Sequence, residues 1–204
     1  MKKTILIISL SIFILTTLKA QEKIQFGAKG GINFTNMTKV EYFYDNKSKT
    51  GFHIGLLAEI PFGDKFSIQP EILYSTHGVN GKVALLYVPF PGAPDPPPLS
   101  GEFKLNYIQV PVLAKIYLVE NFSLELGPSF NFLVLDEENY GTVSDSDIGS
   151  NFEFSGILGL SYKIKSGLFG SIRYVNGFTS AFDRENVSEE AKNIGFQLGV
   201  GFMF

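Results

Sequence analysis

Apolar and polar residues alternate along much of the chain, and the alternation begins near residue 24. In the first such segment the odd positions hold polar residues or glycine, whereas the even positions are Ile24, Phe26, Ala28, Gly30, Ile32 and Phe34. A period of two sends successive side chains to opposite faces and predicts a β-strand with one apolar face. No helical period appears after residue 21, so the pattern indicates an all-β domain.

The same alternation recurs in eight segments, and the apolar side chains occupy the even positions each time. The predicted strands cover residues 24–34, 52–60, 66–75, 107–117, 122–135, 152–164, 168–175 and 193–204. Short turns at residues 63–64, 120–121 and 165–167 carry the residues that tight turns prefer. The long connections cover residues 35–50, 78–103, 136–151 and 176–192.

Short and long connections therefore take turns around an even number of antiparallel strands. This arrangement is typical of outer-membrane barrels, in which short turns face the periplasm and long loops face the outside. The sequence predicts an eight-stranded antiparallel up-and-down transmembrane β-barrel with short periplasmic turns and long extracellular loops.

Charged residues within the predicted strands are confined to the odd face. They are Lys29, Glu59, Glu71, Lys115, Glu125, Glu153, Lys163 and Arg173. A lysine or arginine facing lipid near the bilayer centre costs about 2–4 kcal/mol, so the apolar face is expected outside and the charges inside. An eight-stranded barrel is just wide enough for side chains to fill. We therefore expect a lumenal ion-pair network in which Lys115 and Arg173 each meet at least one of the four glutamates.

Aromatic residues of the even face gather near both ends of the predicted strands. The set expected near the periplasm is Phe26, Phe62, Phe66, Phe122, Tyr162 and Phe204. The set expected near the outer ends is Phe34, Phe52, Tyr74, Phe132, Phe152 and Tyr174. Two aromatic belts are typical of the two interfaces between a membrane and water.

The segment YIQVPVLAKIY, residues 107–117, carries a proline within a predicted strand. Proline lacks the N–H that a ladder needs, and a closed barrel has no edge strand, so Pro111 predicts a β-bulge. Pro70 and Pro128 lie in the neighbouring strands at comparable distances from their turns. We therefore expect a local irregularity across three strands.

Residues 1–20 have the features of a secretory signal peptide. Lys2 and Lys3 precede an apolar run over residues 5–18, and Ala20 offers a small residue for cleavage. The barrel domain would then span residues 21–204. Removal of the three lysines of the signal lowers the formal net charge from −3 to −6, and an acidic chain is a poor partner for nucleic acid.

Residue types that carry catalysis or bind metals are scarce. The chain has no cysteine, which excludes disulfides and thiolate metal sites. His53 and His77, near Ser75, fall on the odd face, so neither is placed to act on a lipid from the bilayer. The acidic run at residues 145–151 begins like a calcium loop, but Gly156 stands where the closing glutamate belongs. We therefore predict no catalytic, cofactor-binding or metal site.

The last twelve residues, NIGFQLGVGFMF, place Phe202 and Phe204 on the apolar face. This ending resembles the signal by which barrel-assembly machinery recognises its clients. That machinery and outer-membrane lipid are therefore the expected partners during insertion.

Four stretches give the chain a family resemblance: FGAKGGINFTNM, YIQVPVLAK, LELGPSFNFLV and GLFGSIRYVNGFTS. Over residues 24–204 the sequence resembles the PorT-like outer-membrane β-barrel proteins common in Bacteroidetes. It departs from them where NFEFSG stands in place of an Asp-Phe-Gly, so Glu153 would replace that aspartate. The resemblance implies a barrel in the outer membrane. The family's namesake is linked to protein secretion, whereas most members have no assigned role.

The expected function is that of a non-enzymatic integral protein in the outer membrane of a Gram-negative cell. It would act through its extracellular loops as a structural, binding or secretion-accessory component. A narrow transport conduit is the alternative, and a lipid-modifying outer-membrane enzyme is a further one. The stretch VPFPGAPDPPPL favours extended backbone and makes one long loop a candidate contact for a protein partner.

Overall fold

The computed structural model describes residues 23–38, 45–83, 99–140, 143–145, 149–182 and 191–204. The predicted signal peptide and nearly all of the proline-rich stretch lie outside these residues. Within the described ranges, no helix is long and apolar enough to cross a membrane.

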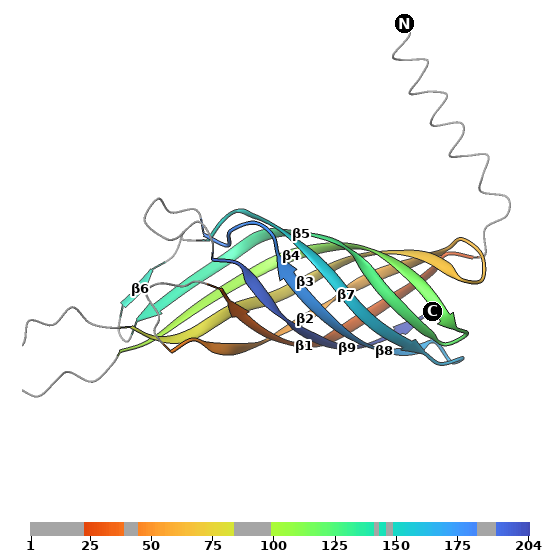
Figure 1. Ribbon diagram of the computed structural model, residues 1–204, viewed down its shortest axis with the longest axis horizontal. Helices are drawn as coiled ribbons and strands as arrows, with labels where there is room; N and C mark the ends of the chain where they lie inside the picture. Colours follow the sequence, from red (N-terminus) through yellow and green to blue (C-terminus); the bar gives the residue numbers. More distant parts are fainter. Residues whose placement is uncertain (1–22, 39–44, 84–98, 141–142, 146–148, 183–190) are drawn as a thin grey trace, which may run out of the picture.

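Eight antiparallel strands form a closed barrel (Figure 1). They are β1 (Gln25–Met37), β2 (Lys47–Pro61), β3 (Phe66–Val83), β4 (Leu99–Val119), β5 (Phe122–Tyr140), β7 (Phe152–Lys163), β8 (Leu168–Gly177) and β9 (Asn193–Met203). Neighbours pair in the order β4-β3-β2-β1-β9-β8-β7-β5, and the pairing of β4 with β5 closes the ring. The predicted eight-stranded up-and-down barrel is confirmed.

Strands β3, β4 and β5 project beyond the others at the end opposite the short turns, here called the outer end (Figure 1). They contain 18, 21 and 19 residues, against 10 in β8. A short strand, β6 (Val143–Asp145), pairs with the last residues of β5. The loop predicted at residues 78–103 is thus wrong in part, because the β3–β4 ladder continues to Val83↔Leu99. Beyond the bilayer a strand needs no apolar outer face, so the alternation that marks a spanning strand is lost there.

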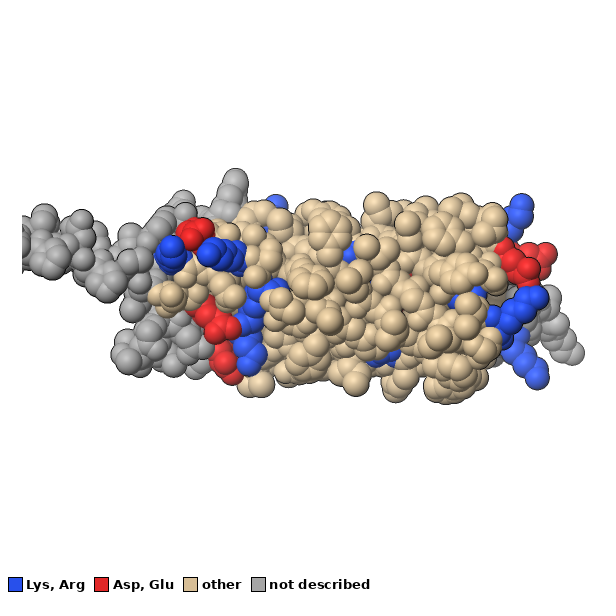
Figure 2. All heavy atoms as spheres, turned by 90° about the horizontal axis from the view of Figure 1, so that it is seen from below, with Lys and Arg blue, Asp and Glu red and all other residues tan. Residues whose placement is uncertain are grey.

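Side chains at even positions of the spanning strands face outward, and those at odd positions face inward, as the alternation predicted. Ile54, Leu56 and Val200 are 59%, 64% and 67% exposed, whereas Leu73 and Leu113 are fully buried. On the face that Figure 2 shows, the exterior forms a largely uncharged belt between two charged ends. So large an exposed apolar surface is typical of contact with hydrocarbon, and the belt marks the membrane-spanning part.

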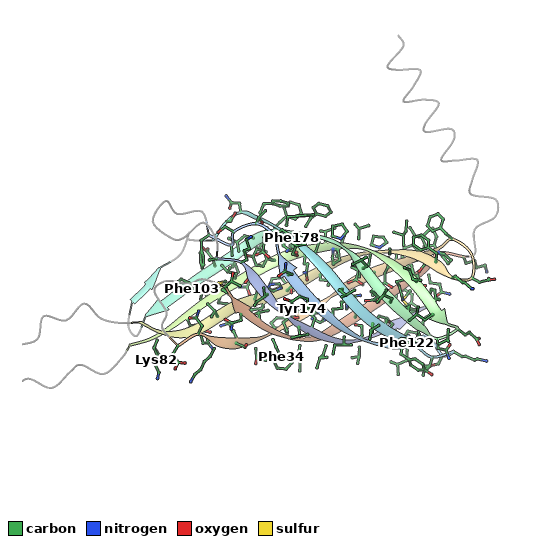
Figure 3. All side chains as sticks on the ribbon, viewed as in Figure 1. Phe34, Lys82, Phe103, Phe122, Tyr174 and Phe178 are labelled. Carbon is green, nitrogen blue, oxygen red and sulfur yellow. The ribbon has the colours of Figure 1, made fainter. Side chains whose placement is uncertain are left out.

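Aromatic side chains line both edges of this belt. Toward the outer end, rings on neighbouring strands lie 5.8, 5.5 and 5.3 Å apart in the pairs Phe52–Tyr74, Phe132–Phe152 and Tyr174–Phe196. At the periplasmic edge the rings of Phe62 and Phe66 are 6.1 Å apart. The barrel axis runs horizontally in Figure 3. Phe34 and Tyr174 lie at a similar position along it, and Phe122 lies nearer the periplasmic end. These are the depths at which interfacial aromatics are found.

The strand prolines do not shift the register. Strand β3 pairs with β4 through Pro70↔Val112 and Leu73↔Gln109, which is the same register on both sides of Pro111. The bulge predicted at Pro111 is therefore wrong, because the ladder omits two pairs there and then resumes in register. The irregularity expected across three strands is present, since the β2–β3 and β4–β5 ladders also omit two pairs each, beside Pro70 and Pro128. Proline removes one donor, and the intact pairs on either side keep the strand in place. The registers shift elsewhere, in the β2–β3 and β4–β5 ladders.

Val112 and Gln109 lie on one strand and face opposite ways, so they test the assignment of the two faces. Val112→Arg would place a guanidinium group against hydrocarbon, and we expect it to lower the free energy of unfolding by about 2–4 kcal/mol. Gln109→Asn, a polar exchange inside the lumen, should cause a much smaller loss. Urea unfolding in lipid vesicles, followed by circular dichroism, would measure both. Equal losses at the two positions would contradict the assignment.

Candidate functional site

The centre of the lumen is occupied by the guanidinium group of Arg173, which is 1% exposed. It reaches from β8 to β3, where Nη1 and Nη2 donate hydrogen bonds to the two oxygens of Glu71 at 2.9 and 2.7 Å. Its Nε donates to Glu125 on β5 at 2.6 Å. Lys29 on β1 adds an ion pair with Glu71 at 3.5 Å. These four residues, here called the central ion cluster, carry no net formal charge.

A glycine on the neighbouring strand makes room for this arginine. A Cβ atom at Gly159 would lie 2.7 Å from Cγ of Arg173 and 2.8 Å from the carbonyl oxygen of Ile172, closer than packed atoms can be. The paired contact with Glu71 also fixes the plane of the guanidinium group. The central ion cluster therefore braces β1, β3, β5 and β8 against one another from inside.

A second group of charges surrounds Glu59 near the periplasmic end. Its carboxylate lies 3.2 Å from Nζ of Lys115 and 3.3 Å from Nζ of Lys163. Tyr117 and Ser67 also donate hydrogen bonds to it. The side chain of Lys163 is 21% exposed, so this group opens toward the periplasmic solvent. The group has one carboxylate for two ammonium groups, and Asp64 and Glu120 line the same mouth beside Lys65.

Glu153 lies apart from both groups, closer to the outer end. It is fully buried and accepts hydrogen bonds from Tyr107 at 3.2 Å and from Asn193. Among the described residues, no lysine or arginine forms an ion pair with it. The sequence prediction grouped Glu153 with the ion-pair network, whereas the structure places it outside. In the β7–β8 ladder Arg173 pairs with Gly159, which is six residues from Glu153 toward the periplasmic end of β7. The guanidinium group of Arg173 is therefore too far from Glu153 along the barrel axis to pair with it.

Both histidines point into the lumen and contact neutral side chains there. Nδ1 of His53 lies 2.7 Å from Oδ1 of Asn33, and Nε2 of His77 lies 2.9 Å from Oγ of Ser75. Asn33 also donates to Ser75 at 3.0 Å, so the four side chains form one polar chain over β1, β2 and β3. Ser75 is fully buried on the lumenal side. The serine–histidine contact is therefore closed to a substrate dissolved in the bilayer.

An apolar cluster closes the lumen at the outer end, and we call it the outer cap. It contains Met37, Val79, Phe103, Leu105, Tyr107, Ala181, Phe182 and Ala191. The rings of Phe103 and Phe182 meet edge to face with their centroids 5.1 Å apart, and Figure 3 shows Phe103 in the projecting part of the barrel. Sequence reasoning missed this cluster because its members lie mostly in segments predicted as loops. The available signal was a set of apolar odd positions on either side of the proline-rich stretch, Val79, Val83, Leu99, Phe103 and Leu105.

Charged side chains of both signs surround the projecting strands, and we call this surface the outer rim. Asp45 lies 3.8 Å from Lys47 and 3.3 Å from Lys82. Together with residues 80–81 and 100–102 they line a polar hollow of about 540 Å³ over β2, β3 and β4. A hollow with these side chains can hold polar or charged groups from the outside solution.

No three acidic or histidine side chains come close enough to hold a metal ion in the part of the chain that the structure describes. Residues 146–148 of the calcium-like acidic run lie outside that part. Phe202 and Phe204, the residues of the predicted assembly signal, face outward and are 46% and 74% exposed.

The match to a protein family accounts for the belt of apolar side chains on the exterior. One family model, described as outer membrane protein beta-barrel domain, matches residues 19–183, which include every strand from β1 to β8. The chain belongs to the outer membrane protein beta-barrel domain family. Its belt of apolar side chains is therefore the surface that meets the lipid of the outer membrane.

Similar solved structures are also outer-membrane proteins. Ail, the attachment invasion locus protein of Yersinia pestis, solved in complex with the heparin analogue sucrose octasulfate, has a TM-score of 0.52 and 15% identity; the match covers 90% of this chain and 100% of that one. Neisserial surface protein A has a TM-score of 0.57 and 14% identity, with 90% and 100% covered. At these identities the likeness concerns the fold alone. A comparison with curated protein sequences found no match.

Arg173→Met would leave Glu125 without its cationic partner in the centre of the lumen. We expect the free energy of unfolding to fall by about 3–5 kcal/mol, because an unpaired buried charge is strongly destabilising. The double variant Arg173→Met/Glu125→Gln should recover most of this loss, since Lys29 still balances Glu71. Urea unfolding in vesicles would compare them. A double variant as unstable as the single one would contradict the pairing.

Lys115→Met should be milder than Arg173→Met in the same assay. Glu59 would keep its contact with Lys163 and its hydrogen bond from Tyr117. The carboxylate would therefore keep a cationic partner and a hydrogen-bond donor. A loss as large as that of Arg173→Met would show that the two groups are not independent.

Proposed function

We propose that this protein is a closed, non-enzymatic barrel whose outer rim and extracellular loops bind a polar partner at the cell surface. The observation that carries the proposal is the filling of the lumen, from the central ion cluster to the outer cap. A membrane barrel that is closed inside meets partners from the aqueous phase at its ends. The projecting strands β3, β4 and β5 enlarge the outer end rather than the periplasmic one (Figure 1).

The outer rim supports the choice of a polar partner. Its hollow carries Lys47 and Lys82 beside Asp45, so it offers both donors and acceptors. Surface charges of both signs contribute more to the specificity and rate of association than to the free energy of binding. A partner with a matching pattern of charges, such as a protein surface, fits this hollow better than an apolar ligand does.

The resemblance to PorT-like proteins supports a narrower form of the same proposal. In this form the partner is a component of a protein secretion pathway. The chain would reach it after cleavage of a signal peptide near Ala20 and insertion by the barrel-assembly machinery. The outward-facing Phe202 and Phe204 support recognition by that machinery, because a receptor can reach them on the lipid-facing side.

A transport conduit and a lipid-modifying enzyme are less well supported. Ion conduction needs room for a hydrated or coordinated ion, and the central ion cluster takes up the lumen with paired side chains. A lipid-modifying enzyme needs its nucleophile and base open to the bilayer, and the contact between Ser75 and His77 faces the lumen instead.

Electrical recordings test the closed lumen. The pure protein in planar bilayers should give no steady open-channel current, because the paired side chains of the central ion cluster and the packed outer cap fill the lumen of the described barrel. A porin measured in the same chamber provides the positive control. Steady currents that scale with the amount of protein would favour the conduit.

Site-directed cross-linking tests the outer rim. A photo-reactive amino acid at position 82 should cross-link a protein partner in intact cells, because Lys82 is exposed in the polar hollow. The same amino acid at position 165 provides a matched control, since Lys165 is also an exposed lysine but lies in a periplasmic turn. Charge reversal at Lys47 should weaken the product from position 82. Products from position 165 alone would contradict the proposal.

A further inference from the structure

The lipid-facing surface of β5, β7 and β8 carries a furrow that the proposed function does not use. Its floor is a row of small side chains paired across the three strands, Pro128, Gly156 and Asn176. One wall consists of Leu126, Leu158 and Tyr174, and the other of Phe154 and Phe178. The furrow has a volume of about 640 Å³, which is the size of many small-ligand sites.

The furrow lies in the outer half of the apolar belt. Pro128 is six residues beyond the start of β5 at Phe122, and Asn176 is eight residues beyond the start of β8 at Leu168. With about 3.3 Å per residue and a strand tilt of about 40°, these positions lie roughly 15 and 20 Å above the periplasmic edge of a band about 25 Å tall. Figure 3 places Phe178 at about the height of Phe34, in the outer aromatic belt. The furrow therefore extends from the acyl chains of the outer leaflet to the interface above them.

Hydrocarbon is the material that can fill this furrow. Apolar atoms line it except at Asn176, and a water molecule needs two to four polar partners. An unfilled furrow would lose van der Waals contacts along both walls. In a bilayer such packing, rather than the hydrophobic effect, drives association, and small residues favour it because they allow close approach.

We propose that this furrow binds one acyl chain of an outer-leaflet lipid. The chain lies between the wall that contains Leu158 and the rings of Phe154 and Phe178, whose centroids are 5.7 Å apart. The end of the Phe178 ring rests against Gly156 and forms part of the same wall. The amide of Asn176 sits at the upper end, where it can donate a hydrogen bond to an ester oxygen of the same lipid. The site shares no residue with the hollow of the outer rim, so its test is independent of the test of the proposed function.

Photo-labelling of the full-length protein in vesicles tests this site directly. The probe is phosphatidylethanolamine with a diazirine near the middle of one acyl chain, and mass spectrometry locates the adducts. Residues 154–158 and 174–178 should be labelled several-fold more than residues 52–56 of β2, which lies four strands away from β7 in the ring of eight. Labelling spread over the belt in proportion to exposure would overturn the proposal.

Two glycine variants separate the furrow from the rest of the belt. In Gly156→Leu the new Cβ would lie 2.8 Å from the end of the Phe178 ring, so this outward-facing ring must move and the leucine and the displaced ring then narrow the furrow. Gly170→Leu adds the same side chain to the same lipid-facing side, where the nearest atom lies 3.9 Å away. We expect Gly156→Leu to reduce the labelling of residues 174–178 several-fold and Gly170→Leu to leave it unchanged.

Folding of each variant is checked by the difference in gel mobility between heated and unheated samples. If Gly156→Leu does not fold, Asn176→Phe blocks the upper end of the furrow from another strand and should give the same loss of labelling. Unchanged labelling in a folded variant, or cross-links between two barrels through the furrow, would overturn the proposal.

Discussion

In a membrane-spanning barrel, charged side chains of the spanning strands can face only the lumen. The closed ring of strands satisfies the backbone N–H and C=O groups, and the lipid requires an apolar exterior. Acids and bases of the spanning strands must therefore share a lumen about as wide as the side chains themselves. Arg173 meets this constraint by binding Glu71 and Glu125 together, while Lys29 balances the remaining charge. The filled interior then leaves a partner from the aqueous phase only the ends of the barrel to contact.

The parts that sequence predicted well are those that the membrane constrains. Between the two aromatic belts, alternation identified both the strands and the direction of each side chain, because lipid tolerates polar groups on one face only. Beyond the belt this constraint ends, and the prediction failed where β3 and β4 continue as paired strands through residues 78–83 and 99–103. The outer cap was missed for the same reason. Its apolar side chains point inward, but the outward positions of the same segments are polar and do not show the apolar face by which the other strands were identified.

Two further failures have other physical causes. The bulge expected at Pro111 did not form, because a ladder can omit pairs without changing its register when both neighbouring strands are held elsewhere. Glu153 was predicted correctly to face the interior, but its predicted ion-pair partners were wrong. Periodicity tells which face a residue occupies, whereas its height along the axis depends on registers that link distant strands. Furrows such as the one over Gly156 depend on the same registers, since three small residues must align across separate strands.

The contact between Arg173 and Glu71 joins residues that are 102 positions apart in the chain. It can form only after β3 and β8 stand on opposite walls of a nearly complete ring, so the central ion cluster is a late event in assembly. Interactions that are absent from the transition state for folding slow the reverse reaction without speeding the forward one. The cluster is therefore expected to affect the rate of unfolding rather than the rate of folding. It contributes little to how fast the barrel closes, and it makes the finished barrel slow to open again.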